Sequence, residues 1–170
     1  MEKDAKSPLL AVINKTSFFD VFSEAEKKKI VYMTGMFKSY EQKGLTIFLE
    51  GEKGDSLFIV LSGTINITKL TNPLNQKSNT SPEEQEHTVI AKMESGDIFG
   101  EVAMLTGKTR ITSAITQSTK NILLEINQEG MCKWNHIIQN KFHKQLLAML
   151  IKKLDSSNRQ YITLNQNHLK

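Results

Sequence analysis

Residues 56–68 read SLFIVLSGTINIT, an apolar run of strand length followed by a glycine and then by alternating polar and apolar residues. A short apolar run bounded by turn signals is typical of a strand that is buried on both faces. Strict alternation, as in Thr64–Thr68, is typical of a strand with one exposed face. Gly63 separates the two segments. The stretch therefore predicts two consecutive β-strands.

Further short segments of this kind, separated by turn residues, lie on both sides of the stretch. Strands this short with turns this frequent indicate a β-sandwich or barrel. The predicted strands are Phe37–Glu41, Thr46–Leu49, Ser56–Ser62, Thr64–Thr68, Thr88–Ala91, Ile98–Phe99, Ile111–Ile115 and Asn121–Ile126. Residues 70–86 are polar and contain Pro73 and Pro82. We expect them to form a mobile loop at the tip of a hairpin.

Helical patterns flank the predicted strands. Residues 9–34 are expected to be helical, since Ser23 and Glu26 have the spacing of a capping box and Gly35 supplies a stop. After Gln128, apolar residues recur at spacings of three and four, which predicts a long C-terminal helix. This stripe would pack on the β-unit, on a partner's helix, or on both. Its members are Ile137, Ile138, Phe142, Leu146, Met149, Leu150 and Leu154.

The composition places the chain among soluble proteins of a reducing compartment. Its single cysteine, Cys132, excludes an internal disulfide framework. The N-terminus lacks the apolar core of a signal peptide, and no stretch approaches the ~20 apolar residues of a membrane span. We therefore expect a cytoplasmic protein without a membrane span. The net charge of +4 favours an anionic partner but does not by itself indicate nucleic acid.

The chain carries 20 lysines but only two arginines, and one of these, Arg110, closely follows Gly100-Glu101. A guanidinium can grip two phosphate oxygens at once, which an ammonium cannot. Gly100 permits close backbone approach, and Glu101–Leu105 can form a short helix whose first N–H groups favour an anion. A carboxylate at such a site needs hydrogen-bond donors, and sugar hydroxyls fit that role. Together these features predict a ribose-phosphate site.

The segment Phe99–Ser113 resembles the phosphate-binding cassette of the cyclic nucleotide-binding domain family, which includes protein kinase A regulatory subunits and the bacterial catabolite activator. The segments Gly51, Gly54-Asp55, Leu57–Gly63 and Gly96–Glu101 also fall in the family's order and approximate spacing. The resemblance implies a mainly β fold, an antiparallel, jelly-roll-like β-roll of about eight strands with N-terminal helices and a long C-terminal helix. It implies an N-terminal extension at 1–15, the cyclic nucleotide-binding domain with its C-terminal helix at 16–160, and a tail at 161–170.

The resemblance also implies roles for individual residues. Arg110 would pair with the exocyclic oxygens of a cyclic phosphate, and Glu101 would accept the ribose 2′-hydroxyl. The backbone amides of Ala103 and Ile111 would donate to the same phosphate, and Gly100 would line the ribose side. The complete predicted ligand-binding set is Gly100, Glu101, Val102, Ala103, Arg110, Ile111 and Thr112. The base would be covered from the C-terminal helix, with Phe142 and Tyr161 as candidates for stacking.

Two positions depart from the family's pattern. Members selective for cGMP often carry threonine directly after the arginine, and here that residue is Ile111, which has no hydrogen-bonding group in its side chain. This favours cAMP, although the neighbouring Thr112 leaves cGMP open. The second departure is Thr109, where many relatives have proline. It should loosen the turn without removing a ligand contact.

We therefore expect a receptor that binds a cyclic mononucleotide, cAMP or alternatively cGMP, reversibly and transmits the signal through movement of its C-terminal helix. The alternative is a ligand-free interaction module that assembles through that helix. In either case a second copy or a protein partner could bind the helix. The chain ends at Lys170, too soon for the helix-turn-helix of the catabolite-activator relatives, so we expect no DNA-binding domain.

No catalytic site, metal site or cofactor is predicted. Leu105–Thr109 resembles the end of a P-loop, but a P-loop requires glycine at the position of Val102. His136 and His143 lie about two helical turns apart, which is too far for an ordinary metal chelate on one helix. We therefore expect a binding protein and not an enzyme.

Overall fold

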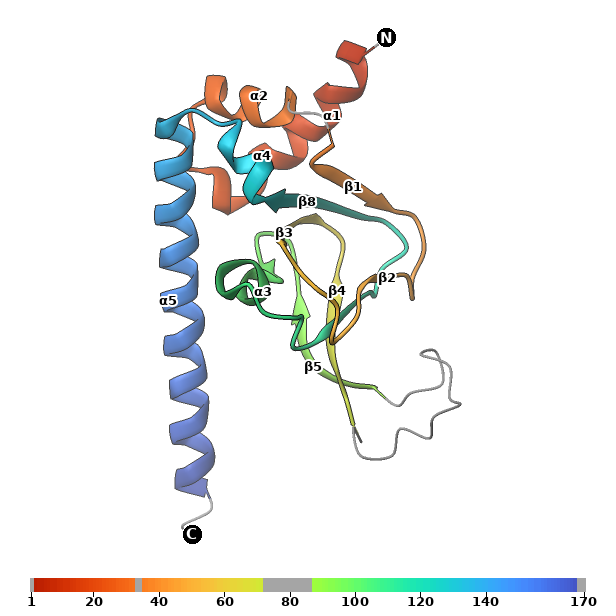
Figure 1. The fold of residues 1–170 in the computed structure, drawn as a ribbon, viewed down its shortest axis with the longest axis vertical. Coiled ribbons are helices and arrows are strands. Elements are labelled where there is room, and N and C mark those ends of the chain that lie inside the picture. Colours follow the sequence, from red (N-terminus) through yellow and green to blue (C-terminus); the bar gives the residue numbers. More distant parts are fainter. Residues whose placement is uncertain (1, 33–34, 72–86, 168–170) are drawn as a thin grey trace. The chain divides into compact units, whose positions relative to one another are not determined.

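The computed structural model describes residues 2–32, 35–71 and 87–167. The chain forms two compact units, residues 1–133 and 134–170. Figure 1 shows the elements, which follow one another as α1 (Glu2–Asn14), η1 (Ser17–Phe19), α2 (Glu24–Tyr32), β1 (Phe37–Tyr40), β2 (Thr46–Phe48), β3 (Ser56–Ser62), β4 (Ile65–Leu70), β5 (His87–Met93), β6 (Ile98–Phe99), α3 (Glu101–Thr106), β7 (Ser113–Thr116), β8 (Asn121–Asn127), α4 (Gln128–Cys132) and α5 (His136–Asn167).

The eight strands of the described residues form two four-stranded sheets. One sheet has the order β1-β8-β3-β6 and the other β2-β7-β4-β5. All of the pairings are antiparallel. The predicted fold class, mainly β with flanking helices, is confirmed. The two strands of residues 56–68 do not pair with each other, because the turn at Gly63 carries the chain from one sheet to the other.

The core of the β-roll lies between the two sheets. It combines inward-facing side chains from strands of both sheets, since successive residues of a strand point to opposite faces. Its buried members are Phe48, Phe58, Val60, Ile65, Ile67, Phe99, Ala114 and Leu123. Three phenylalanine rings pack together within it, with centroid separations between 5.2 and 5.9 Å. The cassette that follows Phe99 is thereby attached to the centre of the roll.

The N-terminal helical region is divided into several elements. The structure confirms the capping box at the start of α2, where Ser23 N donates to Glu26 Oε2 over 2.7 Å and Glu26 N donates to Ser23 Oγ over 3.4 Å. The continuous helical pattern expected over 9–34 is wrong in one respect. The α-helix ends at Asn14, because the hydroxyl of Thr16 turns back onto the Val12 carbonyl and a short 3-10 turn follows. Helices α1, α2 and α4 lie at the same end of the roll (Figure 1).

Two further predictions differ from the structure. Strand β7 begins at Ser113 and not at Ile111, because the backbone of Arg110 bonds to the turn at Gly51 and Glu52 and holds the next residues in a bend. Strands β4 and β5 do pair as a hairpin. The mobile loop predicted between them falls mostly on residues 72–86, which lie outside the described residues.

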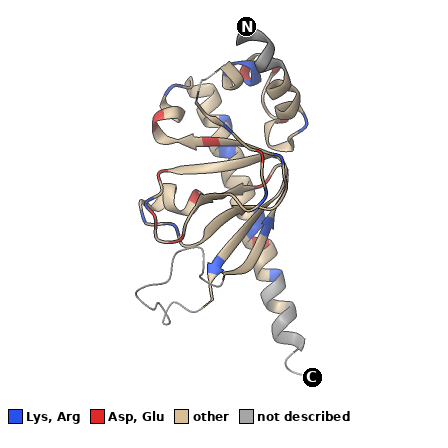
Figure 2. Cartoon of the chain, turned by 90° about the vertical axis from the view of Figure 1, so that its right-hand side faces the viewer, with Lys and Arg blue, Asp and Glu red and all other residues tan. Residues whose placement is uncertain are grey.

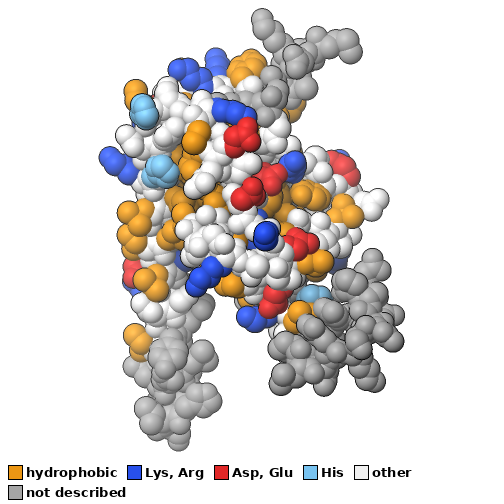
Figure 3. Space-filling view, in the orientation of Figure 1, with side chains coloured by type: hydrophobic (Ala, Val, Ile, Leu, Met, Phe, Trp, Pro, Cys, Tyr) orange, Lys and Arg blue, Asp and Glu red, His pale blue; other side chains and the backbone are white. Residues whose placement is uncertain are grey.

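Helix α5 carries apolar side chains on more than one face. Ile138, Phe142 and Leu146 are buried, in agreement with the predicted stripe, but Ile137 and Leu154 are exposed. Apolar side chains are visible along one side of the helix (Figure 3). None of the described helices is long and apolar enough to cross a membrane.

Charged residues do not gather on one element of the fold. Lysines and arginines are spread over helices, strands and loops, and acidic residues lie among them (Figure 2). In this view of the described residues the positive charge is therefore not concentrated on one element, as a nucleic-acid-binding face would require.

The turn at Gly63 packs closely against the buried side chain of Asn121. Its φ is +89°, and a Cβ there would overlap the side chain of Asn121, a buried amide that accepts the Thr64 N–H over 3.1 Å. Gly51 has the same conformation, with φ of +88°, but open space around it. Alanine at either position costs about 1–2 kcal/mol of backbone strain.

We predict that Gly63→Ala lowers the free energy of unfolding by about 1–3 kcal/mol more than Gly51→Ala, because it also displaces a buried hydrogen-bonded amide. Urea unfolding of both variants measures the difference. Equal losses would show that the Asn121 contact contributes nothing to stability.

Candidate functional site

The cassette begins where β6 leaves the core. Gly100 follows Phe99 with a φ of +77°, a left-handed conformation that glycine adopts far more readily than other residues. This residue starts α3, which ends at Gly107, also left-handed, whose N–H bonds to the Ala103 carbonyl. Glu101 and Ala103 are buried in the first turn, and Val102 is exposed. The short helix therefore places the Glu101 carboxylate inward.

Arg110 is buried, with only 5% of its surface exposed. Its Nη1 donates to the carbonyl oxygens of Ser56, over 2.7 Å, and of Gly100, over 2.6 Å. Its Nη2 donates to the hydroxyl of Ser56 over 3.1 Å. The structure thus joins Arg110 to Gly100, as two members of the predicted set, and adds Ser56.

The face of the Arg110 guanidinium lies on the aromatic cluster of the core. Its Cζ is 4.2 Å from the ring centroid of Phe48 and 5.8 Å from that of Phe58. A cation over an aromatic face is attracted by the negative face of the ring. Phe48 belongs to one sheet and Phe58 to the other. The charge therefore sits at the junction of the two sheets.

Burial lowers the pKa of Arg110 from its ordinary value, and the carboxylates of Asp55, Glu125, Glu52 and Glu101 act in the opposite direction. The guanidinium keeps its charge, because arginine is not deprotonated in proteins. The terminal nitrogens of Arg110 donate instead to the uncharged oxygens of Ser56 and Gly100. Its buried Nε–H has no acceptor among the described residues. A buried cation that carbonyl oxygens solvate is suited to bind an anion.

Two glycines make room for this side chain. A Cβ on Gly54 would lie 2.5 Å from Arg110 Cζ and would also overlap Nε, and a Cβ on Gly100 would lie 2.8 Å from Nη1. The Nε side of the guanidinium therefore occupies the space that a side chain on Gly54 would fill. Any larger residue at either position would displace Arg110.

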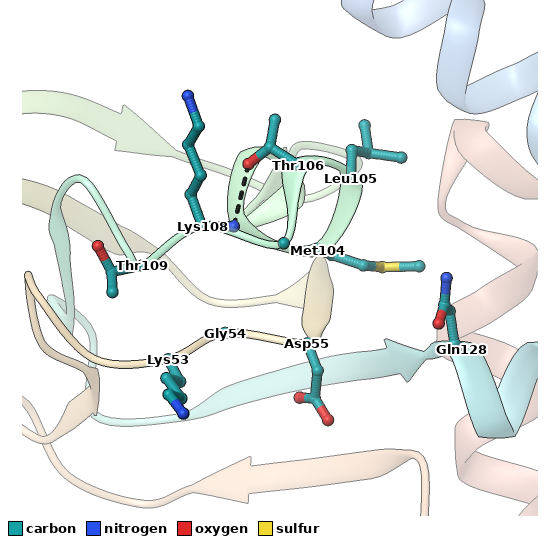
Figure 4. Close-up of a pocket in the computed structure, with 10 residues that line it drawn as sticks. Lys53, Gly54, Asp55, Met104, Leu105, Thr106, Lys108, Thr109 and Gln128 are labelled. Carbon is teal, nitrogen blue, oxygen red and sulfur yellow. Dashed lines mark hydrogen bonds between the residues drawn. The ribbon is translucent and has the colours of Figure 1, made fainter.

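A cavity of about 1100 Å³ borders the cassette (Figure 4). Its walls are residues 53–55, the second half of α3, residues 107–109 and Gln128. Met104 and Gln128 point toward one another in Figure 4. Neither Arg110 nor Glu101 lines it, so it is a neighbour of the predicted phosphate site and not the site itself.

The remaining predicted residues have varied environments. Ile111 is 54% exposed and lies in the bend before β7, where Thr112 is partly buried. The ring of Phe142 is fully buried and packs edge-on against Trp134 at 5.2 Å, and the side chain of Tyr161 lies outside the described residues. In the described ranges, no three His, Cys, Asp or Glu side chains gather closely enough to hold a metal ion.

Sequence reasoning did not identify Ser56, Phe48 or Phe58 as neighbours of Arg110. They lie more than fifty residues earlier in the chain, and their approach depends on the pairing of distant strands. The only local signal was the position of Ser56 directly after Gly54-Asp55, at the start of a buried strand.

The comparisons of this chain with known proteins agree on one family. The family model described as cyclic nucleotide-binding domain matches residues 38–133. The cGMP-dependent protein kinase of Caenorhabditis elegans is 30% identical over 127 residues, 75% of this chain and 15% of the kinase. The CRP-like cAMP-activated global transcriptional regulator of Mycobacterium tuberculosis is 26% identical over 139 residues, 81% of this chain and 56% of the regulator. The chain thus spans less than two thirds of either relative.

A solved structure has the same fold. The crystal structure of a cyclic nucleotide-binding domain from Methylobacillus flagellatus matches with a TM-score of 0.67 at 22% identity, covering 92% of this chain and 82% of that one. At this identity the likeness concerns the fold alone.

The contact between Gly54 and Arg110 yields a prediction for stability. Gly54 is not among the glycines with positive φ, so alanine there meets mainly the guanidinium. We expect Gly54→Ala to lower the free energy of unfolding by about 1–3 kcal/mol, because Arg110 loses charged hydrogen bonds. In an Arg110→Ala background the same substitution should cost less than about 0.5 kcal/mol. Urea unfolding of the four proteins measures both values, and equal costs in the two backgrounds would contradict the contact.

Proposed function

Because the chain belongs to the cyclic nucleotide-binding domain family, we propose that it binds a cyclic mononucleotide reversibly, with cAMP as the preferred ligand, and performs no chemistry on it. The observation that carries the proposal is the buried guanidinium of Arg110, whose Nε–H has no acceptor among the described residues. A cyclic phosphate would bring both a negative charge and acceptor oxygens for its N–H groups.

The cassette offers further groups for the same ligand. The first N–H groups of α3, that of Ala103 among them, have no acceptor within the helix and would donate to the phosphate, together with the Ile111 amide. The buried carboxylate of Glu101 would accept the ribose 2′-hydroxyl, and Gly100 would allow the sugar to approach the backbone. Val102 and Thr112 complete the proposed set.

The choice of base rests on the residue after Arg110. Ile111 offers no side-chain donor or acceptor to a guanine, which supports adenine. The names of the relatives do not decide between cAMP and cGMP, since one is a cGMP-dependent kinase and the other a cAMP-activated regulator. Thr112 keeps cGMP as a second ligand to be tested.

A second candidate function is assembly through α5 without a ligand. Leu147, Ile151 and Leu154 lie three and four residues apart on this helix, and all three are exposed. Such a stripe suits contact with another helix. The buried charge of Arg110 favours the receptor, and the stripe is compatible with both functions. In the receptor, movement of α5 would transmit the binding event.

We predict that the purified chain binds cAMP with micromolar or tighter affinity and does not bind AMP. A ligand of roughly 22 heavy atoms at about −0.3 kcal/mol per atom gives a Kd near ten micromolar before any preorganised phosphate contact. Isothermal titration calorimetry with cAMP, cGMP and AMP measures this and shows whether Ile111 predicts the base. No heat with any of them, on folded protein free of carried-over ligand, would favour the assembly module.

We further predict that Arg110→Lys weakens cAMP binding at least ~30-fold, because a bidentate donor becomes a point charge at a buried site. The matched control is Arg159→Lys, which changes the only other arginine, an exposed residue of α5. It should bind as the wild type does. Unchanged affinity in Arg110→Lys would remove the phosphate assignment.

A further inference from the structure

We infer that Ser56 is a positioning residue, which fixes the orientation of the Arg110 guanidinium before any ligand binds. Ser56 contacts two guanidinium nitrogens from two of its own atoms. Its carbonyl oxygen accepts from Nη1 over 2.7 Å, and its hydroxyl lies 3.1 Å from Nη2. No other residue makes hydrogen bonds to both nitrogens in the described part of the chain.

Ser56 is itself held firmly. It is 4% exposed and is the first residue of β3, where it pairs with Asn127 of β8. Strand β3 pairs with β8 from Ser56 onward, and with β6 at Phe58 and Ile59. The sheet therefore fixes the position of the Ser56 carbonyl. The described residues offer the hydroxyl of Ser56 one hydrogen-bond partner, Arg110.

The other contacts of Arg110 leave Nη2 without a hydrogen-bond partner among the described residues. Packing on Phe48, at 4.2 Å, sets the plane of the guanidinium but has little preference for its direction within that plane. Both carbonyl contacts act on Nη1 alone. The hydroxyl of Ser56 acts on Nη2, so it holds the second terminal nitrogen of the guanidinium in place.

This orientation matters because a guanidinium that is already fixed loses less conformational entropy when it binds a phosphate. The buried Nε–H has no acceptor among the described residues and lies beside Gly54, so the direction set by Ser56 also decides where this donor points. The consequence for affinity rests on the proposed function. The orientation of Arg110 does not rest on it and can be measured without ligand.

The first experiment is NMR of the arginine side chains in the ligand-free chain. Since the sequence has two arginines, only Arg110 and Arg159 contribute Nε–H signals. Ser56→Thr and Ser56→Val have the same shape and differ in the hydroxyl, so any cost of the added methyl group is common to both. We expect slow rotation of the Arg110 Nη groups in the wild type and in Ser56→Thr, and rotation at least about tenfold faster in Ser56→Val, which lacks the Nη2 partner.

A control separates this effect from general destabilisation. Thr116 is a buried residue of β7 whose hydroxyl donates to the Gln42 carbonyl and accepts the Leu45 N–H, away from Arg110. Thr116→Val should lower stability and leave the Arg110 signals unchanged. The inference is overturned if the Arg110 Nη groups rotate as slowly in Ser56→Val as in Ser56→Thr. It is also overturned if Thr116→Val changes the Arg110 signals as much as Ser56→Val does.

The second experiment is a double-mutant cycle on cAMP affinity by calorimetry. Ser56→Val should bind about tenfold more weakly than Ser56→Thr, and the difference should fall below about twofold in an Arg110→Lys background, because the two residues act as a unit. A tenfold difference in both backgrounds would show that Ser56 does not act through Arg110. If the wild type binds no cyclic nucleotide, the proposed function fails, and the NMR result alone decides the role of Ser56.

Discussion

A guanidinium buried between two β-sheets must be solvated by the protein, and the rest of the cassette is arranged around that requirement. Carbonyl oxygens of Ser56 and Gly100 supply acceptors, and Phe48 supplies an aromatic face. None of these groups carries a negative charge, so they solvate the cation without supplying a counter-charge. A full ion pair would have satisfied the side chain better and would have left less reason for an external anion to bind.

The same requirement explains the choice of small residues around the cassette. Gly54 and Gly100 both face the guanidinium, where a single Cβ would collide with it. Gly100 in addition takes the left-handed conformation that turns β6 into α3. A residue that looks like a simple turn signal in the sequence therefore has two physical functions, one in the backbone and one in the space left for a side chain.

Local features of the fold could be predicted from the sequence, and features that depend on distant partners could not. The buried run of β3 and the capping box at Ser23 follow from periodicity and short spacings, and the structure confirms both. The end of α1 at Asn14 and the late start of β7 depend on specific hydrogen bonds that periodicity does not report. Arg110 and Gly100 could be singled out by residue type. Ser56 could not, because its contact requires two strands to be placed first.

The position of β8 in its sheet has a consequence for the folding of the chain during synthesis. This strand is the last of the roll in the chain, yet it lies between β1 and β3, and Phe37 at the start of β1 pairs with Leu124 within it. Such a sheet is dominated by contacts between residues far apart in sequence, which slows folding because long loops must close first. During synthesis, β1 and β3 leave the ribosome without the strand that joins them. Until β8 follows, the edges that it will occupy are open to pairing with other chains.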